Sequence, residues 1–212
     1  MNKNIAILGG SFNPITLSHV QIAFKTFESD KFDEIWISPC YSNPFKNNLT
    51  EGYHRLKMCE LAIEGTNLPI KVCDFEIKNK INGGTYVFLK ELSKEFVTCN
   101  FSYIIGGDQV EALSTWRNYD KLIENFDFVF FNRYGNEIIN VDPKIKYTLI
   151  NERIEPLSST LFRENFKKEK YEICKYIVDY KVFDYILENK LYLLERKTPT
   201  SLVSVDVSDS FL

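Results

Sequence analysis

The 212-residue sequence contains little that is typical of metal-binding, disulfide-bonded or membrane-spanning proteins. Its only histidines are His19 and His54, and its five cysteines are scattered without a C-x-x-C pair. An odd number of scattered cysteines is typical of a reducing compartment, and two histidines argue against a structural zinc site. No apolar run approaches the roughly 20 residues that cross a bilayer, and the N-terminus lacks the apolar core of a signal peptide. We therefore expect a cytoplasmic protein with no membrane partner.

A strong excess of charge of one sign is also missing. The chain has 26 basic and 29 acidic residues and a net charge of −3, which argues against nucleic acid as a partner. Its 44% hydrophobic and 26% charged content is ordinary for a globular domain. We find no internal repeat and no interdomain linker, so we expect one domain over residues 1–196. The sequence leaves the oligomeric state open, a homo-oligomer included.

The last residues, 197–212, are rich in Ser, Thr and Val and have no helical periodicity. We expect them to form a flexible tail. The alternation of apolar and polar residues over 202–207 leaves an edge strand as the alternative.

Short apolar runs alternate with stretches of helical periodicity along the chain. This alternation predicts a Rossmann-like α/β fold with a doubly wound, mainly parallel sheet, helices on both faces and ligands at the carboxyl ends of the strands. Glycines follow the first and fourth predicted strands, and we expect these two turns to lie side by side. The predicted strands cover residues 5–8, 32–39, 70–75, 101–105, 127–131 and 147–150. The predicted helices cover residues 20–27, 51–64, 85–96, 162–166 and 173–191.

A glycine-rich turn connects the first strand to the first helix, over residues 8–19. Gly9 and Gly10 lack the Cβ that would keep a phosphate away from the main chain, and the start of a helix offers unpaired N–H groups. Ser11 and Phe12 belong to the same predicted phosphate-binding turn. The pattern is not the G-x-G-x-x-G of dinucleotide sites, because it leads to His19 at the start of the helix. A histidine there can donate a hydrogen bond to a phosphoryl oxygen on which charge builds up, which predicts a nucleotidyl-transfer loop.

A second polar cluster opens a helix far downstream. Hydroxyl side chains at a helix start pair with its N–H groups, which also attract anions. Arg163 lies one turn further on, where its planar fork can bind the β- and γ-phosphates of a nucleotide. Taken alone, the cluster reads as an ordinary N-cap with a solvated arginine; the glycine-rich turn shifts the interpretation toward phosphate binding. The three hydroxyl residues are Ser158, Ser159 and Thr160.

The two motifs together resemble the nicotinamide/nicotinate mononucleotide adenylyltransferases, a branch of the nucleotidyltransferase superfamily. Residues 10–19 read G-S-F-N-P-I-T-x-x-H, like the first signature of the family, and residues 158–163 match its S-S-T-x-x-R. Three further segments agree in order, namely G-x-D at 106–108, H-R-x-x-M at 54–58 and Y-I-x-x-x-x-L-Y at 185–192. The resemblance implies transfer of the adenylyl group of ATP to the mononucleotide, with NAD or its deamido form and pyrophosphate as products.

The resemblance also implies residues that bind the mononucleotide. Asp108, which follows Gly106, would accept hydrogen bonds from ribose hydroxyls, and an N-cap role for the next helix is compatible with this. Trp116 would stack on the pyridine ring, with core packing as the alternative. Thr85 lies in the region where the family contacts the carboxamide or carboxylate of the pyridine.

Two basic residues complete the implied site. Lys46, in the loop after the second strand, would reach a phosphate of either substrate, or would simply be solvated. Arg133 would hold the phosphate of the mononucleotide or the edge of the adenine, or would lie at the surface. We expect His19, Arg163 and Lys46 to perform catalysis by neutralising charge, with Mg²⁺ carried by ATP and no metal site on the protein.

Four positions depart from common forms of the signatures. Thr16 stands where the wider superfamily often has a first histidine, although eukaryotic-type members also read N-P-I-T, and Ser18 replaces a glycine. Asn13 replaces the aspartate common in bacterial members, and Phe88 stands where members usually have a threonine. Because a hydroxyl supplies no charge, we interpret Thr16 as orienting His19.

Two other functions remain open. A sister transferase would use another phosphate acceptor such as phosphopantetheine or glycerol phosphate. A nucleotide-binding regulator or chaperone on the same fold would bind ATP or NAD without turnover, and the threonine at position 16 is the sole feature that favours it.

Overall fold

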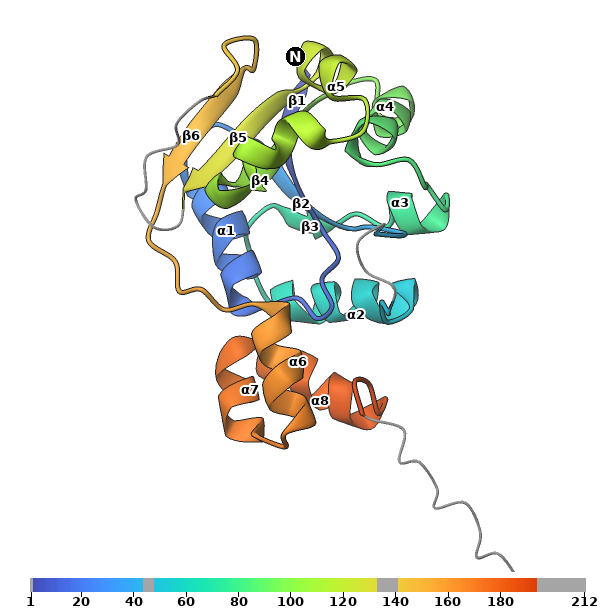
Figure 1. Ribbon diagram of the computed structural model, residues 1–212, viewed down its shortest axis with the longest axis vertical. Coiled ribbons are helices and arrows are strands. Elements are labelled where there is room, and N and C mark those ends of the chain that lie inside the picture. Colours follow the sequence, from blue (N-terminus) through green and yellow to red (C-terminus); the bar gives the residue numbers. More distant parts are fainter. Residues whose placement is uncertain (1, 44–47, 133–140, 194–212) are drawn as a thin grey trace, which may run out of the picture.

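A computed structural model describes residues 2–43, 48–132 and 141–193 of the chain. Its centre is a six-stranded sheet with the order β3-β2-β1-β4-β5-β6, in which all neighbouring strands are parallel. Helices cover both faces of the sheet (Figure 1). The predicted doubly wound α/β fold is confirmed. The strands are β1 (Lys3–Gly10), β2 (Glu34–Pro39), β3 (Ile70–Val72), β4 (Cys99–Gly106), β5 (Asp127–Asn132) and β6 (Tyr147–Asn151).

The sheet is organised around β1, which is buried on both faces. Its side chains alternate, so that Ile5 and Ile7 join the core on one face while Ala6 and Leu8 join the core on the other. A parallel strand covered on both sides needs such a continuous apolar run. Because β1 pairs with both β2 and β4, the order of the chain reverses here, and the turns after β1 and β4 leave from neighbouring strands. The expectation that these two glycine-bearing turns lie side by side is confirmed.

The helices divide into two groups, one for each core. Helices α1, α2 and α6 to α8 contribute to one core, whereas α4, α5, the 3-10 turn η2 and Val110 just before it contribute to the other. Over the described ranges, no helix combines the length and the apolar character needed to cross a membrane. The helices are α1 (Leu17–Glu28), α2 (Gly52–Ile63), α3 (Phe75–Lys78), α4 (Thr85–Glu95), α5 (Tyr119–Asn125), α6 (Ser159–Lys167), α7 (Tyr171–Ile177) and α8 (Tyr180–Glu188), with η1 at Gly107–Gln109 and η2 at Glu111–Thr115.

The three C-terminal helices lie together below the sheet, next to α2 (Figure 1). Helix α8 packs against α2, and Phe162, Phe166 and Phe183 share a core with Met58 and Cys59 of α2. This shared core attaches α6 to α8 firmly to the sheet-bearing part. It also brings the end of the described chain close to the turn after β1.

Two expectations about individual elements are wrong. The single helix predicted over 173–191 is two helices, because Val178 is extended and Asp179 caps α8 by accepting a hydrogen bond from Lys181 N at 2.9 Å. The strand predicted over 70–75 ends at Val72, because Phe75 already begins the short helix α3. A helix was expected after Asp108, and the chain there forms η1, η2 and then α5. The predicted tail, 197–212, lies outside the described residues.

Candidate active site

Gly9 and Gly10 end β1 and make room for two aromatic rings. A Cβ on Gly9 would lie 2.0 Å from the hydroxyl oxygen of Tyr103, and one on Gly10 would lie 2.9 Å from the ring of Phe12. The sequence suggested a different reason, the close approach of a phosphate. The main chain is further fixed by Cys40, whose N–H donates to the Gly10 carbonyl at 2.9 Å and so ties this turn to the end of β2.

His19 is held in one orientation at the start of α1. Its Nδ1 lies 3.0 Å from Thr16 N and 2.8 Å from Thr16 Oγ1, and its ring meets the ring of Phe12 edge to face at 5.1 Å. Because the Thr16 N–H donates to Nδ1, this nitrogen acts as an acceptor and the ring proton belongs on Nε2. Phe12 adopts a left-handed backbone with φ of 43° and is buried. The contacts support the interpretation that Thr16 orients His19.

The start of α1 is bonded to the segment that leads into the second motif. Thr16 Oγ1 donates to the carbonyl of Leu157 at 3.1 Å. Ser18 Oγ donates to the carbonyl of Glu155 and accepts from the N–H of Leu157, the latter at 3.0 Å. The two residues that depart from the common H-x-G-H pattern therefore connect the two motifs.

The second motif touches the first directly. Ser158 is the N-cap of α6, since its side chain accepts from Leu161 N at 3.1 Å. Ser159 Oγ donates to the Pro14 carbonyl at 2.7 Å. Arg163 Nη1 donates to the Asn13 carbonyl at 2.7 Å across 150 positions of sequence, and its Nη2 lies 3.3 Å from the hydroxyl of Thr160. The structure thus brings His19, Arg163 and the hydroxyl residues to one place.

Thr85 and Trp116, the two residues predicted at the pyridine ring, both contact Tyr103. The side chain of Thr85, the first residue of α4, is hydrogen bonded to the Tyr103 hydroxyl. Trp116 is half-buried just after η2 and meets Tyr103 edge to face at 6.1 Å. Burial raises the pKa of Tyr103, and the charge of nearby Glu76 adds to this effect, so the hydroxyl stays protonated. Tyr103 also packs over Gly9. It therefore contacts both the first motif and the two residues predicted to bind the pyridine ring.

The remaining residues singled out in the sequence do not join these contacts among the described residues. Gly106 ends β4, and Asp108 is exposed in η1 and is not the N-cap of η2. Phe88 is 2% exposed and belongs to the core beneath α4, so this departure from the family pattern fills the interior. Lys46 and Arg133 lie outside the described residues. Among the residues that are described, no group of three or more His, Cys, Asp or Glu side chains could hold a metal ion.

Arg55 is a residue whose importance the sequence did not reveal, although it lies in the H-R-x-x-M segment. It is 1% exposed, and its three hydrogen bonds all go to main-chain carbonyls, namely Thr50 at 2.8 Å, Ser11 at 2.9 Å and Tyr41 at 3.4 Å. These carbonyls belong to the turns that follow β1 and β2. Arg55 therefore fixes both turns at the carboxyl edge of the sheet.

Glu76, in α3, contacts the turn after β2 as well, through the main chain of Tyr41. Burial raises the pKa of its carboxyl to about 7, against the opposing effects of the hydrogen bond from Tyr41 N at 3.0 Å and of the positive charge of Arg55. The N–H and the carbonyl of Tyr41 are thus held by Glu76 and Arg55, two oppositely charged side chains.

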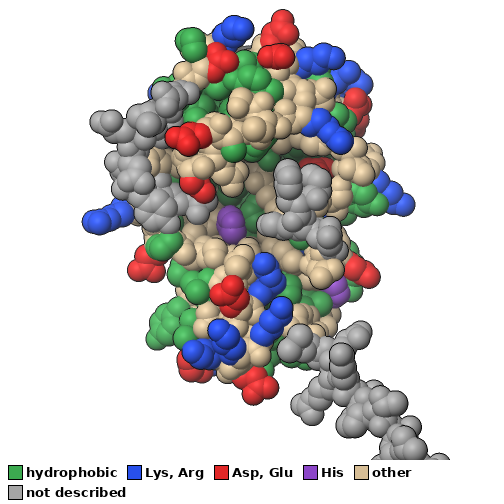
Figure 2. All heavy atoms as spheres, in the orientation of Figure 1, with side chains coloured by type: hydrophobic (Ala, Val, Ile, Leu, Met, Phe, Trp, Pro, Cys, Tyr) green, Lys and Arg blue, Asp and Glu red, His purple; other side chains and the backbone are tan. Residues whose placement is uncertain are grey.

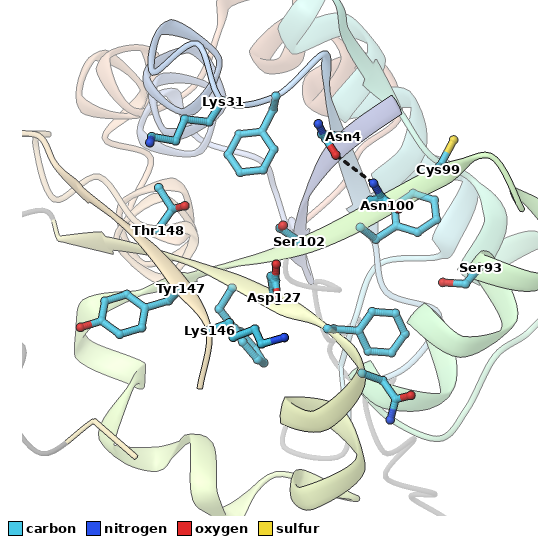
Figure 3. A pocket seen from close by; sticks show the side chains of 15 residues that line it. Asn4, Lys31, Ser93, Cys99, Asn100, Ser102, Asp127, Lys146, Tyr147 and Thr148 are labelled. Carbon is cyan, nitrogen blue, oxygen red and sulfur yellow. Dashed lines mark hydrogen bonds between the residues drawn. The ribbon is translucent and has the colours of Figure 1, made fainter. Parts of the chain in front are cut away.

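A histidine side chain is visible in a hollow in the middle of one face of the molecule (Figure 2). A groove lies elsewhere on the molecule. It has a volume of about 570 Å³ and lies at the amino edge of the strands, where Asn4 bonds Asn100 beside Asp127, Lys146 and Tyr147 (Figure 3). In α/β sheets of this kind ligands bind at the carboxyl edge. We therefore assign the site to the two motifs and not to this groove.

The comparisons with known proteins agree with this assignment. A model of the cytidylyltransferase-like family matches residues 7–165, a span that contains both motifs. A Bacillus cytotoxicus protein named "Probable nicotinate-nucleotide adenylyltransferase" is 35% identical over 194 residues, which cover 90% of this chain and 98% of that protein. The chain belongs to this adenylyltransferase family. An Oceanobacillus iheyensis protein of the same name is 32% identical and covers 90% of this chain and 97% of its own length.

Solved structures of the adenylyltransferase family share the fold. The Plasmodium falciparum nicotinic acid mononucleotide adenylyltransferase complexed with NaAD superposes with a TM-score of 0.75 at 28% identity, covering 90% of this chain and 97% of that chain. The same enzyme complexed with APC gives a TM-score of 0.72 at 27% identity, with the same coverage of both chains. The resemblance found in the sequence is confirmed.

Proposed function

We propose that this enzyme transfers the adenylyl group of ATP to nicotinate or nicotinamide mononucleotide and releases pyrophosphate, a step of NAD biosynthesis. The observation that carries the proposal is the direct contact of the two motifs, made by Arg163 and the Asn13 carbonyl at 2.7 Å beside the oriented ring of His19. The names of the relatives support the same reaction. A reducing, cytoplasmic location fits the five cysteines, all of them described, which form no disulfide.

The reaction forms one P–O bond and breaks another. An oxygen of the mononucleotide phosphate attacks the α-phosphorus of ATP, and the bond from that phosphorus to the bridging oxygen breaks, so that pyrophosphate leaves with the electron pair. A phosphate monoester has a second pKa of about 6, so the attacking oxygen is already deprotonated at neutral pH and needs no general base. The work left to the protein is alignment and stabilisation of charge.

Groups from both motifs stabilise the negative charge on the phosphates of ATP. His19 donates from Nε2 to an oxygen of the α-phosphate, where negative charge grows in the transition state. Arg163 offers its planar fork to the β- and γ-phosphates, helped by the hydroxyl residues Ser158, Ser159 and Thr160 and by the main chain of Gly9 to Phe12. Lys46 keeps its predicted role at the phosphates. Mg²⁺ enters as the counterion of ATP, bound by the triphosphate and water.

The mononucleotide occupies the side lined by Tyr103. Trp116 packs on the pyridine ring, Thr85 meets its carboxylate or carboxamide, and Asp108, beside Gly106, accepts from ribose hydroxyls. Arg133 keeps its predicted role at the phosphate or the adenine edge. The relatives are named for the nicotinate form, which supports the acid as the preferred substrate.

A panel of acceptors tests the proposal. Release of pyrophosphate from Mg·ATP is measured with nicotinate mononucleotide, nicotinamide mononucleotide and phosphopantetheine. We expect turnover with the first, slower turnover with the second and none with the third. Turnover with phosphopantetheine alone would make the chain a sister transferase. Binding of ATP or NAD in calorimetry without any turnover, by protein with a cooperative unfolding transition, would make it a regulator.

A further inference from the structure

Tyr192 lies just after α8, one residue before the end of the described chain, and its side chain contacts the turn after β1. The ring meets those of Phe162 and Phe166 edge to face, at 6.0 Å and 6.4 Å. The backbone of Tyr192 is left-handed, with φ of 62°, a conformation that a tyrosine adopts only where other contacts hold it. The family resemblance includes this tyrosine at the end of its last motif but assigns it no role.

The hydroxyl of Tyr192 is bonded to the side chain of Asn13. It donates to Asn13 Oδ1 at 2.8 Å, and the N–H of Thr50 donates to the same oxygen at 3.3 Å. The Thr50 side chain is in turn hydrogen bonded to the hydroxyl of Tyr192. Asn13 Nδ2 lies 3.4 Å from the carbonyl of Asn48. Asn13 is 4% exposed, so water is not available to replace these partners if one of them is lost.

Asn13 lies between the groups that we assign to catalysis. Its own carbonyl accepts the hydrogen bond from Arg163. Phe12, on one side of it, packs against the ring of His19, and Pro14, on the other, accepts from Ser159. A rotation of the Asn13 peptide would therefore move the acceptor of Arg163 and the ring that supports His19 together. Errors of about 1 Å in such groups cost large factors in rate.

We propose that Tyr192 is a positioning residue of the adenylyl-transfer site, which acts by holding Asn13 and, through it, Arg163 and the Phe12–His19 pair. The inference rests on the proposed function. On this proposal, the segment directly after α8 contributes to the reaction as well as to the hydrophobic core. Burial raises the pKa of Tyr192, so its hydroxyl remains a donor throughout the working range of pH.

The chain offers a matched control in Tyr185, which lies in α8. Its hydroxyl also bonds a distant side chain, His54 Nδ1 in α2 at 2.8 Å, but that bond does not reach the turn after β1. Tyr192→Phe and Tyr185→Phe each remove one hydroxyl from a C-terminal tyrosine. The Tyr192 hydroxyl bonds Asn13 and Thr50, whereas that of Tyr185 bonds His54 of α2. A purely structural role of Tyr192 would give the two variants the same kinetics.

The test compares kcat, the KM for each substrate and thermal unfolding in the two variants and the wild type. We expect Tyr192→Phe to lower kcat roughly fivefold to tenfold, because Asn13 and the groups that it positions are held less precisely, with KM changed less than about twofold. Tyr185→Phe should keep kcat within about twofold. In an Asn13→Ala background, Tyr192→Phe should have no further effect on kcat, because its target is gone.

Two results would overturn the inference while leaving the proposed function intact. One is a wild-type enzyme with normal turnover whose kcat is unchanged by Tyr192→Phe, even if the melting temperature falls. The other is an equal loss of kcat from Tyr192→Phe with and without Asn13. Absence of turnover in the folded wild type would instead refute the proposed function, and the role of Tyr192 with it.

Discussion

His19 owes its orientation to Thr16 and Phe12, and our proposal gives it the main part in the chemistry. Thr16 fixes Nδ1 as an acceptor, so the ring presents an N–H at Nε2. Removing a donor that acts only in the transition state typically costs a hundredfold to a thousandfold in kcat. We expect His19→Ala to lower kcat at least about a hundredfold, with a smaller change in KM, in an assay of pyrophosphate release.

His54 is the matched control for this variant, because it is the other histidine of the chain. Its Nδ1 pairs with Tyr185 in a half-buried contact between α2 and α8. His54→Ala should keep kcat close to the wild-type value. If His19→Ala retained normal turnover, His19 would not have the role assigned to it.

Glu34 makes a separate prediction about stability. Burial alone would raise the pKa of this carboxyl, but hydrogen bonds from Lys3, Lys71 and the indole of Trp36 outweigh burial and lower the pKa to about 2. A depressed pKa stabilises the fold above the unfolded value of 4.5, and this contribution is lost as the pH falls toward 2. Because the lysines are exposed, we expect a loss of about 1–2 kcal/mol between pH 6 and pH 3.

Urea unfolding over this pH range measures the effect. The free energy of unfolding of the wild type should fall more steeply with acid than that of Glu34→Gln. Glu28→Gln, which removes an exposed partner of Lys25, should follow the wild-type curve. Parallel curves for the wild type and Glu34→Gln would contradict the assignment.

At the scale of elements, the contact between β1 and β4 explains why β1 ends in glycine. The Cβ of an alanine at Gly9 would meet both the hydroxyl oxygen of Tyr103, at 2.0 Å, and its ring carbon Cζ, at 2.6 Å. We expect Gly9→Ala to lower the free energy of unfolding by about 1–3 kcal/mol. Tyr103→Ala should relieve this cost in the double variant, whereas Tyr103→Phe, which keeps the ring, should not. Additive effects of Gly9→Ala and Tyr103→Ala in a double-mutant cycle would contradict the packing argument.

The sequence predicted elements well where periodicity was strong and poorly where a local contact decided. The run around Ile5 to Leu8 and the aromatic run of β5 could only be buried strands, and the order of strands followed from their alternation with helices. The break between α7 and α8 depends on the cap supplied by Asp179, and no change of hydrophobic pattern announces it. The helix start at residues 158–160 was predicted correctly, because hydroxyl residues have a local reason to stand there, and Ser158 is its N-cap.

At the scale of the whole molecule, the sequence identified both motifs but not what joins them. The contacts of Arg163 with Asn13 and of Ser18 with Leu157 connect positions more than a hundred residues apart and follow only from the fold. The roles of Arg55 and Tyr103 were missed because they also depend on long-range contacts. In the sequence, Arg55 looks like an ordinary residue of a helix and Tyr103 like an ordinary residue of a buried strand. The predicted roles of the site residues stay predictions, and those of Lys46 and Arg133 concern positions outside the described ranges.

We propose that residues 1–196 form the complete catalytic domain. Ending the chain at Arg196 keeps Tyr192 and the shared core of α2 with α6 to α8, so we expect kcat and the melting temperature to stay close to the full-length values. Ending it at Leu191 removes the partner of Asn13 and should lower kcat at least as much as Tyr192→Phe. Equal loss of activity in both truncated chains would show that residues after 196 are needed.

The central claim is that this site breaks the bond next to the α-phosphorus of ATP and joins the adenylyl group to a mononucleotide. ATP labelled at its α-phosphate, incubated with Mg²⁺, nicotinate mononucleotide and the enzyme, tests this directly. All of the label consumed should appear in deamido-NAD, with one unlabelled pyrophosphate formed for each dinucleotide. Label remaining in ADP, with phosphate released or transferred, or label in free AMP without dinucleotide, would contradict the account.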